Sequence, residues 1–440
     1  MSKESFVNGF SKLSKREKIE LISNLDYIEE DAKDELKTFW HPHIKIQTLL
    51  DEFSENSLSN FPLPYGVIPH IKINERDYIV PMVIEESSVV AAASSSAKFW
   101  SKNGGFHAEI TETDKVGQIH FTIDKSGYQT LKSKINELKK LILSECREII
   151  ESMEKRGGGI KDISLLDKND DLKDYYQLFF TFETCNSMGA NFINTVLEKA
   201  AKTLNDFVEN GYEFKQHNNE FQIIMSILSN YTPNCLCKVW IEASYDQLEN
   251  IDPNLSGKEF AEKFEKAVII ANNDVYRATT HNKGIFNGID AVTIATGNDF
   301  RAVEACGHAY AARDGKYRGL TSVELKDNKF KYILEIPLSV GTIGGLTNLH
   351  PLSRFSMKLL KNPDAKELMK ICASVGLANN FSAIKSLITN GIQNGHMKMH
   401  LINLLNANDA TESEKNKAVD HFKKHNVSAT SVKKFLREIR

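Results

Sequence analysis

Residues 281–305 read HNKGIFNGIDAVTIATGNDFRAVEA and form the most informative stretch of the sequence. The apolar run from Ala291 to Ala295 lies between two polar segments that contain glycine, which predicts a strand with a turn at each end. One turn carries Lys283 and the other carries Asp299. A lysine near a carboxylate in a partly dry site stays protonated and can donate a hydrogen bond to a developing oxyanion. A strand with ordinary charged ends is the simpler interpretation of the spacing alone.

An acid pair, Glu85 and Glu86, comes directly before a segment rich in alanine and serine that runs to Trp100. Ser87 and Ser88 predict the start of a helix there. Two acids before a helix start are favoured by the helix dipole, so capping is the simpler account of the pair. The alternative is that one carboxylate points into a cleft, where burial raises its pKa and allows it to give up a proton.

Two further segments are rich in small residues. Residues 184–191, TCNSMGAN, open a predicted helix directly after a predicted strand, and backbone N–H groups there can approach a dinucleotide phosphate. The segment lacks the Gly-x-Gly-x-x-Gly pattern, so it does not predict a Rossmann fold. Residues 340–346, VGTIGGL, form a glycine-rich turn that either a ligand-binding loop or a plain hairpin would explain.

A histidine follows two glycines in residues 391–397, GIQNGHM. A lone histidine such as His396 is usually a surface or capping residue. At the hinge of a mobile segment it could instead protonate a leaving group near neutral pH.

The composition limits the class of protein. The chain has 440 residues, which favours two or three domains. The net charge of −3 gives no reason to expect a nucleic-acid or membrane-surface partner. No apolar run approaches the roughly 20 residues that cross a bilayer, and no signal peptide is evident. We therefore expect a cytoplasmic protein. The only close cysteine pair, Cys235 and Cys237, lacks nearby partners at ligand spacing, so we expect reduced thiols and no metal site.

The order of predicted elements suggests an insertion. Strand patterns at 117–124, 160–166, 176–182 and 220–228 alternate with helical patterns at 131–155 and 188–210. Polar amphipathic helices (1–60) and strands at 70–73 and 78–84 precede this module. Strand and helix patterns resume from residue 238, including a strand at 330–338, and residues 382–440 are helical throughout. The module therefore interrupts a larger body.

Taken together, these segments resemble class II, or bacterial-type, 3-hydroxy-3-methylglutaryl-CoA reductases over about residues 5–425. The matching motifs occur in the family's order: Glu-Glu-x-Ser-x-Val-Ala-Ala-Ala-Ser (85–94), Ser-Met-Gly-Ala-Asn (187–191), Ile-Leu-Ser-Asn (227–230), residues 282–305 and Asn-Gly-His-Met (394–397). Residues 289–305 are the most specific of them.

The resemblance implies an α+β fold. A large mixed domain is built around a long central helix, and it receives a small α/β cofactor domain with an antiparallel sheet. On this basis residues 1–111 and 223–381 form the large substrate-binding domain, 112–222 the inserted NAD(P)-binding domain, and 382–440 a C-terminal helical flap. The resemblance also implies a homodimer or higher homo-oligomer with active sites shared between subunits, which the flap closes.

The implied reaction is the two-step reduction of the hydroxymethylglutaryl-CoA thioester to mevalonate and CoA by NADH or NADPH, or its reverse. Each hydride transfer requires an oxyanion stabiliser and a proton, and the released thiolate also requires a proton. By resemblance, Lys283 stabilises the oxyanion and Glu86 and Asp299 belong to the proton network. His396 protonates the CoA thiolate.

Binding residues follow from the same resemblance. An arginine can pair with the free carboxylate of the substrate, and the matching substrate positions are Ser88, Arg277, Asn380 and Ala383. The matching cofactor positions are Asn186, Met188, Gly189, Asn191, Asn230 and Asn287. The family usually has aspartate where Asn186 stands, and an arginine that meets CoA phosphates where Ser11 stands.

Two alternatives remain open. The first is the same scaffold acting on another acyl-CoA, against which Arg277 argues because a buried guanidinium requires a substrate carboxylate. The second is a non-catalytic family member that acts as a binding protein, against which the four catalytic residues argue. The sequence distinguishes neither NADH from NADPH nor mevalonate synthesis from its breakdown.

Overall fold

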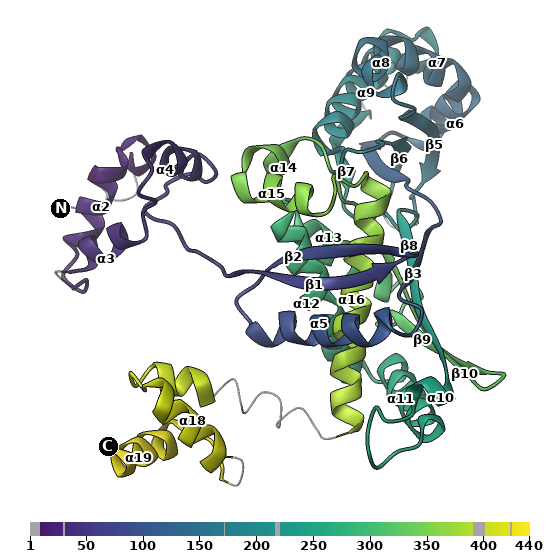
Figure 1. Ribbon diagram of the computed structural model, residues 1–440. Helices are drawn as coiled ribbons and strands as arrows, with labels where there is room; N and C mark the ends of the chain where they lie inside the picture. The colour runs from purple at the N-terminus through teal and green to yellow at the C-terminus, as the bar shows by residue number, and fades with distance from the viewer. Residues whose placement is uncertain (1–8, 30, 171, 216–220, 390–400, 423–424) are drawn as a thin grey trace. The chain divides into compact units, whose positions relative to one another are not determined.

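Figure 1 shows the computed structural model of the chain, which describes residues 9–29, 31–170, 172–215, 221–389, 401–422 and 425–440. The chain divides into two units, Met1–Pro64 and Tyr65–Arg440. The described residues of the first unit contain only short helices, η1 (Phe10–Lys12), α2 (Lys15–Ser23), α3 (Ala32–Thr38) and α4 (Ile44–Asp51). Ser14 and Glu17 form a capping box at the start of α2. These helices agree with the amphipathic pattern predicted for residues 1–60.

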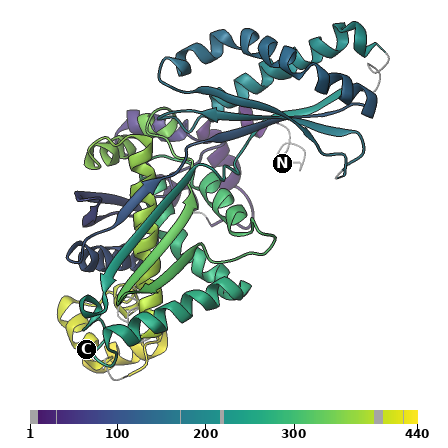
Figure 2. The same cartoon turned by 90° about the vertical axis from the view of Figure 1, so that its right-hand side faces the viewer.

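Within the second unit, a four-stranded antiparallel sheet has the order β5-β6-β4-β7. Its strands are β4 (Lys115–Thr122), β5 (Gly159–Asp167), β6 (Tyr175–Glu183) and β7 (Gln222–Ser229). The helices α6 (Lys125–Ser133), α7 (Ile135–Glu145), α8 (Arg147–Glu154) and α9 (Ala190–Asn210), with the short η2 (Tyr212–Phe214), complete this part. Figure 2 shows the helices on one face of the sheet, where a single apolar core joins helices and strands.

Two predictions for this region need correction, and the others are confirmed. The single helix predicted at 131–155 is wrong, because the structure contains three helices with breaks at Lys134 and Cys146. Neither break contains proline or glycine, so the sequence gives no signal for them. The predicted strands and the predicted helix at 188–210 are confirmed within a few residues. β7 pairs with β4, so the predicted boundary between 222 and 223 falls at the start of a strand of the small sheet.

The larger part of this unit has one apolar core around α16 (Ala365–Ile388). It contains the hairpin β1 (Tyr65–Ile73) and β2 (Arg76–Val83), and an antiparallel sheet of order β3-β8-β10-β9. Those strands are β3 (His107–Ile110), β8 (Leu236–Ser244), β9 (Thr321–Lys326) and β10 (Lys329–Pro337). The other helices are α5 (Ser87–Ser101), α10 (Tyr245–Leu248), α11 (Gly257–Asn273), α12 (Val275–Ala295), α13 (Phe300–Ala311), α14 (Gly345–Leu349) and α15 (Pro351–Leu359).

The α+β class with a long central helix is confirmed. Helix α16 is long and apolar enough to cross a membrane, but 72% of its apolar window is buried, which is the burial of a core helix. The predicted flap boundary between 381 and 382 falls inside α16. Further along, α18 (Glu412–His421) and α19 (Ala429–Ile439) share a separate apolar cluster with Leu401 and Leu405. All cysteines are free, as predicted, and only Cys185 is not buried.

The strand predicted at Ala291–Ala295 is wrong, because these residues are the last turns of α12. Ala291, Val292, Thr293 and Ala295 are all buried, since α12 packs against neighbours on several sides. A helix buried on most of its surface shows no apolar stripe, and a short apolar run with β-branched residues then looks like a strand. Tertiary packing overrides the local preference here.

Close contact between α12 and α16 depends on two glycines. A Cβ atom at Gly288 would lie 2.6 Å from the carbonyl oxygen of Val375, and one at Gly376 would lie 2.8 Å from Cγ1 of Ile289. Each helix therefore presents a glycine to the other, and the two backbones approach closely. This contact fixes the axial position of α12, which carries several predicted site residues.

We expect Gly288→Ala to destabilise the protein by about 1–3 kcal/mol, because the added methyl group meets backbone that cannot move aside. Urea unfolding measures the change. Gly284→Ala is the matched control on the same helix, since the nearest atom to its Cβ is the Asn380 side-chain nitrogen at 3.3 Å. Equal stability of the two variants would contradict the proposed close packing.

Candidate active site

A lysine and a glutamate meet where α12 passes the start of α5. Nζ of Lys283 lies 3.6 Å from Oε2 of Glu86, and the two side chains are 63% and 40% exposed. The hydroxyl of Ser88 donates to Oε1 of Glu86 at 2.5 Å. Glu86 is the N-cap residue of α5, yet its carboxylate makes no capping hydrogen bond. Capping therefore does not account for Glu86, and the pair is accessible to a ligand.

Asp299 is held at the far end of α12. The N–H groups of Gly297 and Asn298 donate to the carbonyls of Ile294 and Thr293 at 3.0 and 2.9 Å, and Gly297 has a φ of 72°. This is the Schellman arrangement, which ends the helix and holds the following residue at its terminus. Asp299 then begins α13, where its carboxylate accepts from the N–H groups of Arg301 and Ala302.

The electrostatics of Asp299 favour its ionised form. Partial burial opposes ionisation, but hydrogen bonds from the Arg301 side chain and from backbone N–H groups outweigh it and lower the pKa of Asp299. The Arg301 guanidinium approaches both carboxylate oxygens, at 3.0 and 3.1 Å. Ten residues of helix separate Lys283 from Thr293, about 15 Å along the axis. Within one chain, the structure brings Lys283 to Glu86 and not to Asp299.

The predicted substrate residues lie on α12 and α16. Arg277 is half-buried, burial lowers its pKa, and no described carboxylate forms a salt bridge with it. Asn380 is 1% exposed; its amide nitrogen donates to the carbonyl of His281 at 2.7 Å, and its oxygen accepts from the Tyr332 hydroxyl. Asn380 therefore ties α16 to α12 and β10. Ala383 follows within one turn of α16 and is partly buried.

Asn186 joins the cofactor segment to the larger part of the unit. Its side-chain oxygen accepts from the N–H of Ala365, the first residue of α16, at 3.0 Å. Its carbonyl accepts from the N–H of Thr342 at 2.8 Å. A Cβ atom at Gly341 would lie 2.5 Å from the N atom of Met188. The two segments rich in small residues are therefore in contact, and asparagine here accepts the hydrogen bond that an aspartate would.

The start of α9 fits an anionic cofactor group. Its N-cap residue is Gly189 at a φ of 93°, no side chain caps it, and no acidic residue occupies its first turn, where Asn191 lies. The first N–H groups of a helix lack partners within the helix, and its dipole favours an anion. Met188 and Asn230 line a narrow hollow beside this terminus. Asn287 lies one turn after Lys283 on the same side of α12 and is partly exposed.

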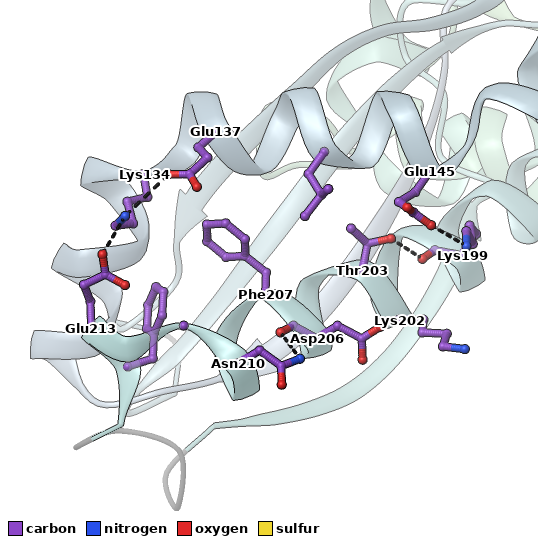
Figure 3. A pocket seen from close by; sticks show the side chains of 13 residues that line it. Lys134, Glu137, Glu145, Lys199, Lys202, Thr203, Asp206, Phe207, Asn210 and Glu213 are labelled. Atoms are coloured by element: carbon purple, nitrogen blue, oxygen red, sulfur yellow. Dashed lines mark hydrogen bonds and ion pairs between the residues drawn. The ribbon is translucent and has the colours of Figure 1, made fainter.

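His396 falls outside the described residues. A hollow of about 450 Å³ lies between α7 and α9 (Figure 3). It contains none of the predicted site residues, and four of its charged side chains form ion pairs, Lys134 with Glu213 at 2.8 Å and Lys199 with Glu145 at 2.7 Å. Among the residues described, no group of His, Cys, Asp or Glu could hold a metal ion.

The sequence reasoning missed Lys115, a buried lysine in the same hollow as Met188 and Asn230. A signal existed. Gly117, Ile119 and Phe121 are buried at alternate positions of β4, and Lys115 continues this series one step earlier. Period-two alternation therefore places a lysine where an apolar residue is normal.

Comparison with known proteins gives consistent matches. The family model of hydroxymethylglutaryl-coenzyme A reductase matches residues 20–401. The chain is 34% identical over 422 residues to the 3-hydroxy-3-methylglutaryl-coenzyme A reductase of Archaeoglobus fulgidus, covering 94% of this chain and 90% of that protein. It is 36% identical to the class II enzyme of Streptococcus pneumoniae bound to NADPH in open conformations, with a TM-score of 0.68, covering 87% of this chain and 99% of that chain. A second structure of the Streptococcus pneumoniae reductase is 35% identical, with a TM-score of 0.69 over 98% of this chain and 99% of that chain.

His281 predicts a pH dependence of stability. Its Nε2 is hydrogen-bonded to the Thr321 hydroxyl at 2.6 Å, and burial, followed by the charge of Arg277, lowers the pKa of His281 from 6.5 to about 3. The unfolded chain therefore binds the proton first as the pH falls below 6.5. This contribution to stability is complete above pH 6.5 and is lost toward pH 3.

We expect His281→Gln to reduce the loss of unfolding free energy between pH 7 and pH 5 by about 2 kcal/mol. Urea unfolding at both pH values measures it. Asp290 acts with the opposite sign, because burial and the charge of Glu304 raise its pKa, so the comparison between variants isolates His281. An unchanged pH dependence in His281→Gln would show that the histidine is not buried in its neutral form.

Proposed function

The chain belongs to the hydroxymethylglutaryl-coenzyme A reductase family and is an NAD(P)H-dependent oxidoreductase, and we propose that Lys283, paired with Glu86, stabilises the oxyanion at the reacting carbonyl. The substrate is 3-hydroxy-3-methylglutaryl-CoA, reduced to mevalonate and CoA. The observation that supports this role is the ion pair of 3.6 Å at an accessible position. Exposed ion pairs contribute little to stability, so a structural role does not explain it.

The chemistry requires a fixed cation at one oxygen. The reduction consumes two hydrides, and two molecules of NAD(P)H, bound one after the other, would supply one hydride each. Each arrival places negative charge on the carbonyl oxygen, first of the thioester and then of the aldehyde, and an oriented ammonium stabilises that charge. The Glu86 carboxylate orients the Lys283 ammonium and, with Asp299, forms the proton network for the final alcohol. His396 protonates the CoA thiolate that leaves between the two hydride steps.

Arg277 supports the choice of substrate. It is half-buried without a described acidic partner, and it precedes Lys283 by six residues, about 9 Å along α12. A guanidinium in this state binds a carboxylate strongly, with two parallel hydrogen bonds. The hydroxymethylglutaryl group carries a free carboxylate at the end opposite the thioester. Acyl-CoA substrates that lack this carboxylate would leave Arg277 unpaired, which disfavours the alternative of another acyl-CoA.

A second copy of the chain would complete the site. About 15 Å of helix runs from Lys283 to Thr293, before the turn that leads to Asp299, and Glu86 is the one described carboxylate that forms a salt bridge with Lys283. We therefore infer a homodimer or higher homo-oligomer in which the Asp299 of one chain faces the Lys283 of its partner. The burial of α16 in the core supports a cytoplasmic location.

We expect Lys283→Ala to lower turnover by about 100- to 1000-fold, the usual loss for one oxyanion donor. Reduction of the thioester and of mevaldehyde should fall together, because both pass through an oxyanion, while CoA binding stays unchanged. Spectrophotometric oxidation of NADPH with each substrate measures both steps.

Lys329→Ala is the matched control. Lys329 is 60% exposed and forms an ion pair of 2.9 Å with Glu242, so it resembles Lys283 in exposure and partner. The control should retain wild-type turnover. Near-normal activity of Lys283→Ala, or equal losses in both variants, would remove the role assigned to Lys283.

A further inference from the structure

Lys115 is a buried cation at the first position of β4. Lys115 is only 3% exposed, and its ammonium donates to the carbonyl of Thr113 at 3.2 Å. No described carboxylate forms a salt bridge with it. Burial of a charged group without an opposite charge is costly. A lysine retained in this state therefore requires an explanation other than stability.

Two acidic residues lie near Lys115, Asp114 in the sequence and Glu183 on the neighbouring strand β6, and both have other partners. Asp114 forms an ion pair with Lys161. Glu183 accepts from the Thr113 hydroxyl and from the N–H of Cys185. Neither acid is within ion-pair distance of Lys115. The ammonium thus lacks a counter-charge in the described structure.

The position of Lys115 is set by the packing of α9 on the sheet. A Cβ atom at Gly117 would lie 2.6 Å from Cδ1 of Leu197 and 3.1 Å from Cγ2 of Ile193, so this glycine allows α9 to lie close to β4. Lys115 is on the same side of the strand, two residues nearer the start of α9. Lys115 and the first turn of α9 therefore line one hollow, whose other lining residues are Met188, Ala190, Ile193, Leu228, Ser229, Asn230, Thr232, Ala302 and Ser339.

Size and charge define what can enter this hollow. Its volume is about 10 Å³, which holds roughly one water-sized group. An aromatic ring does not fit, whereas a single oxygen atom of a larger anion does. The uncapped N-terminus of α9, with Gly189 as its N-cap, adds backbone donors and a positive dipole end to the ammonium. Two independent features therefore favour an anionic oxygen.

We propose that Lys115 binds a phosphate oxygen of the dinucleotide NAD(P)H, together with the N-terminus of α9. The inference rests on the proposed function, because it assigns the anion to the cofactor of that reaction. Lys115 contacts the diphosphate and not the reacting ring, so it is a cofactor-binding residue. The cost of a buried cation in the free protein is offset when the cofactor binds.

Lys115→Met tests the proposal in the full-length protein. We expect the dissociation constant for NADPH to rise at least tenfold, as measured by calorimetry, while the affinity for hydroxymethylglutaryl-CoA is unchanged. Inorganic diphosphate should compete with NADPH on the wild type and much more weakly on the variant. The melting temperature of the ligand-free variant should equal or exceed that of the wild type, because a buried unpaired charge has been removed.

Lys199→Met is the matched control, since Lys199 lies on α9 but pairs with Glu145 away from the hollow, and it should bind NADPH normally. Wild-type affinity of Lys115→Met for NADPH would overturn the proposal. Equal loss of NADPH and substrate binding with a lower melting temperature would also overturn it, in favour of a structural role. A wild-type protein that binds NADPH but does not reduce the thioester would refute the proposed function and leave the Lys115 measurement interpretable.

Discussion

The packing of α12 against α16 is the constraint on which the candidate site depends. Gly288 and Gly376 let the two backbones meet, and Asn380 adds hydrogen bonds to the carbonyl of His281 and to Tyr332. Because α12 is fixed in this way, the helical rise per residue determines where the side chains of Arg277, Lys283 and Asn287 project. Lys283 reaches Glu86, whereas Asp299 follows the Schellman turn, beyond about 15 Å of helix between Lys283 and Thr293. A rigid helix therefore separates residues whose proposed roles require them to meet, and a second subunit resolves the conflict.

The two lysines of the proposed machinery occupy opposite environments. Lys283 is mostly exposed and has a carboxylate partner, so its side chain is oriented and can still reach a substrate oxygen. Lys115 is buried and has no described acidic partner, so its charge favours an anion that enters from outside. Arg277 combines partial burial with the same lack of a partner. Unpaired buried cations reduce the stability of a fold, and they are typical of sites whose ligand supplies the opposite charge.

The sequence predicted the fold class and most strands, and it assigned Lys283 and Glu86 to one catalytic set, largely through family motifs. It failed where burial hides periodicity. Residues 291–295 are helical because α12 is enclosed on several sides, and no apolar stripe marks such a helix. The breaks at Lys134 and Cys146 carry no glycine or proline. Lys115 belongs to no family motif, because the motif at 187–191 marks the start of α9 and not the strand β4 on which α9 packs. The separation of Asp299 from Lys283 became apparent only once the intervening residues were known to be helical.

The most direct test of a site shared between subunits combines two inactive variants, Lys283→Ala and Asp299→Ala, in one heterodimer. If Asp299 is supplied by the partner, one of the two sites has both residues intact, and the purified heterodimer should show about half of the wild-type turnover of hydroxymethylglutaryl-CoA. Each variant alone should be inactive. If the heterodimer is as inactive as its parents, then each chain uses its own Lys283 and Asp299, and the account of α12 as a fixed spacer between them is contradicted.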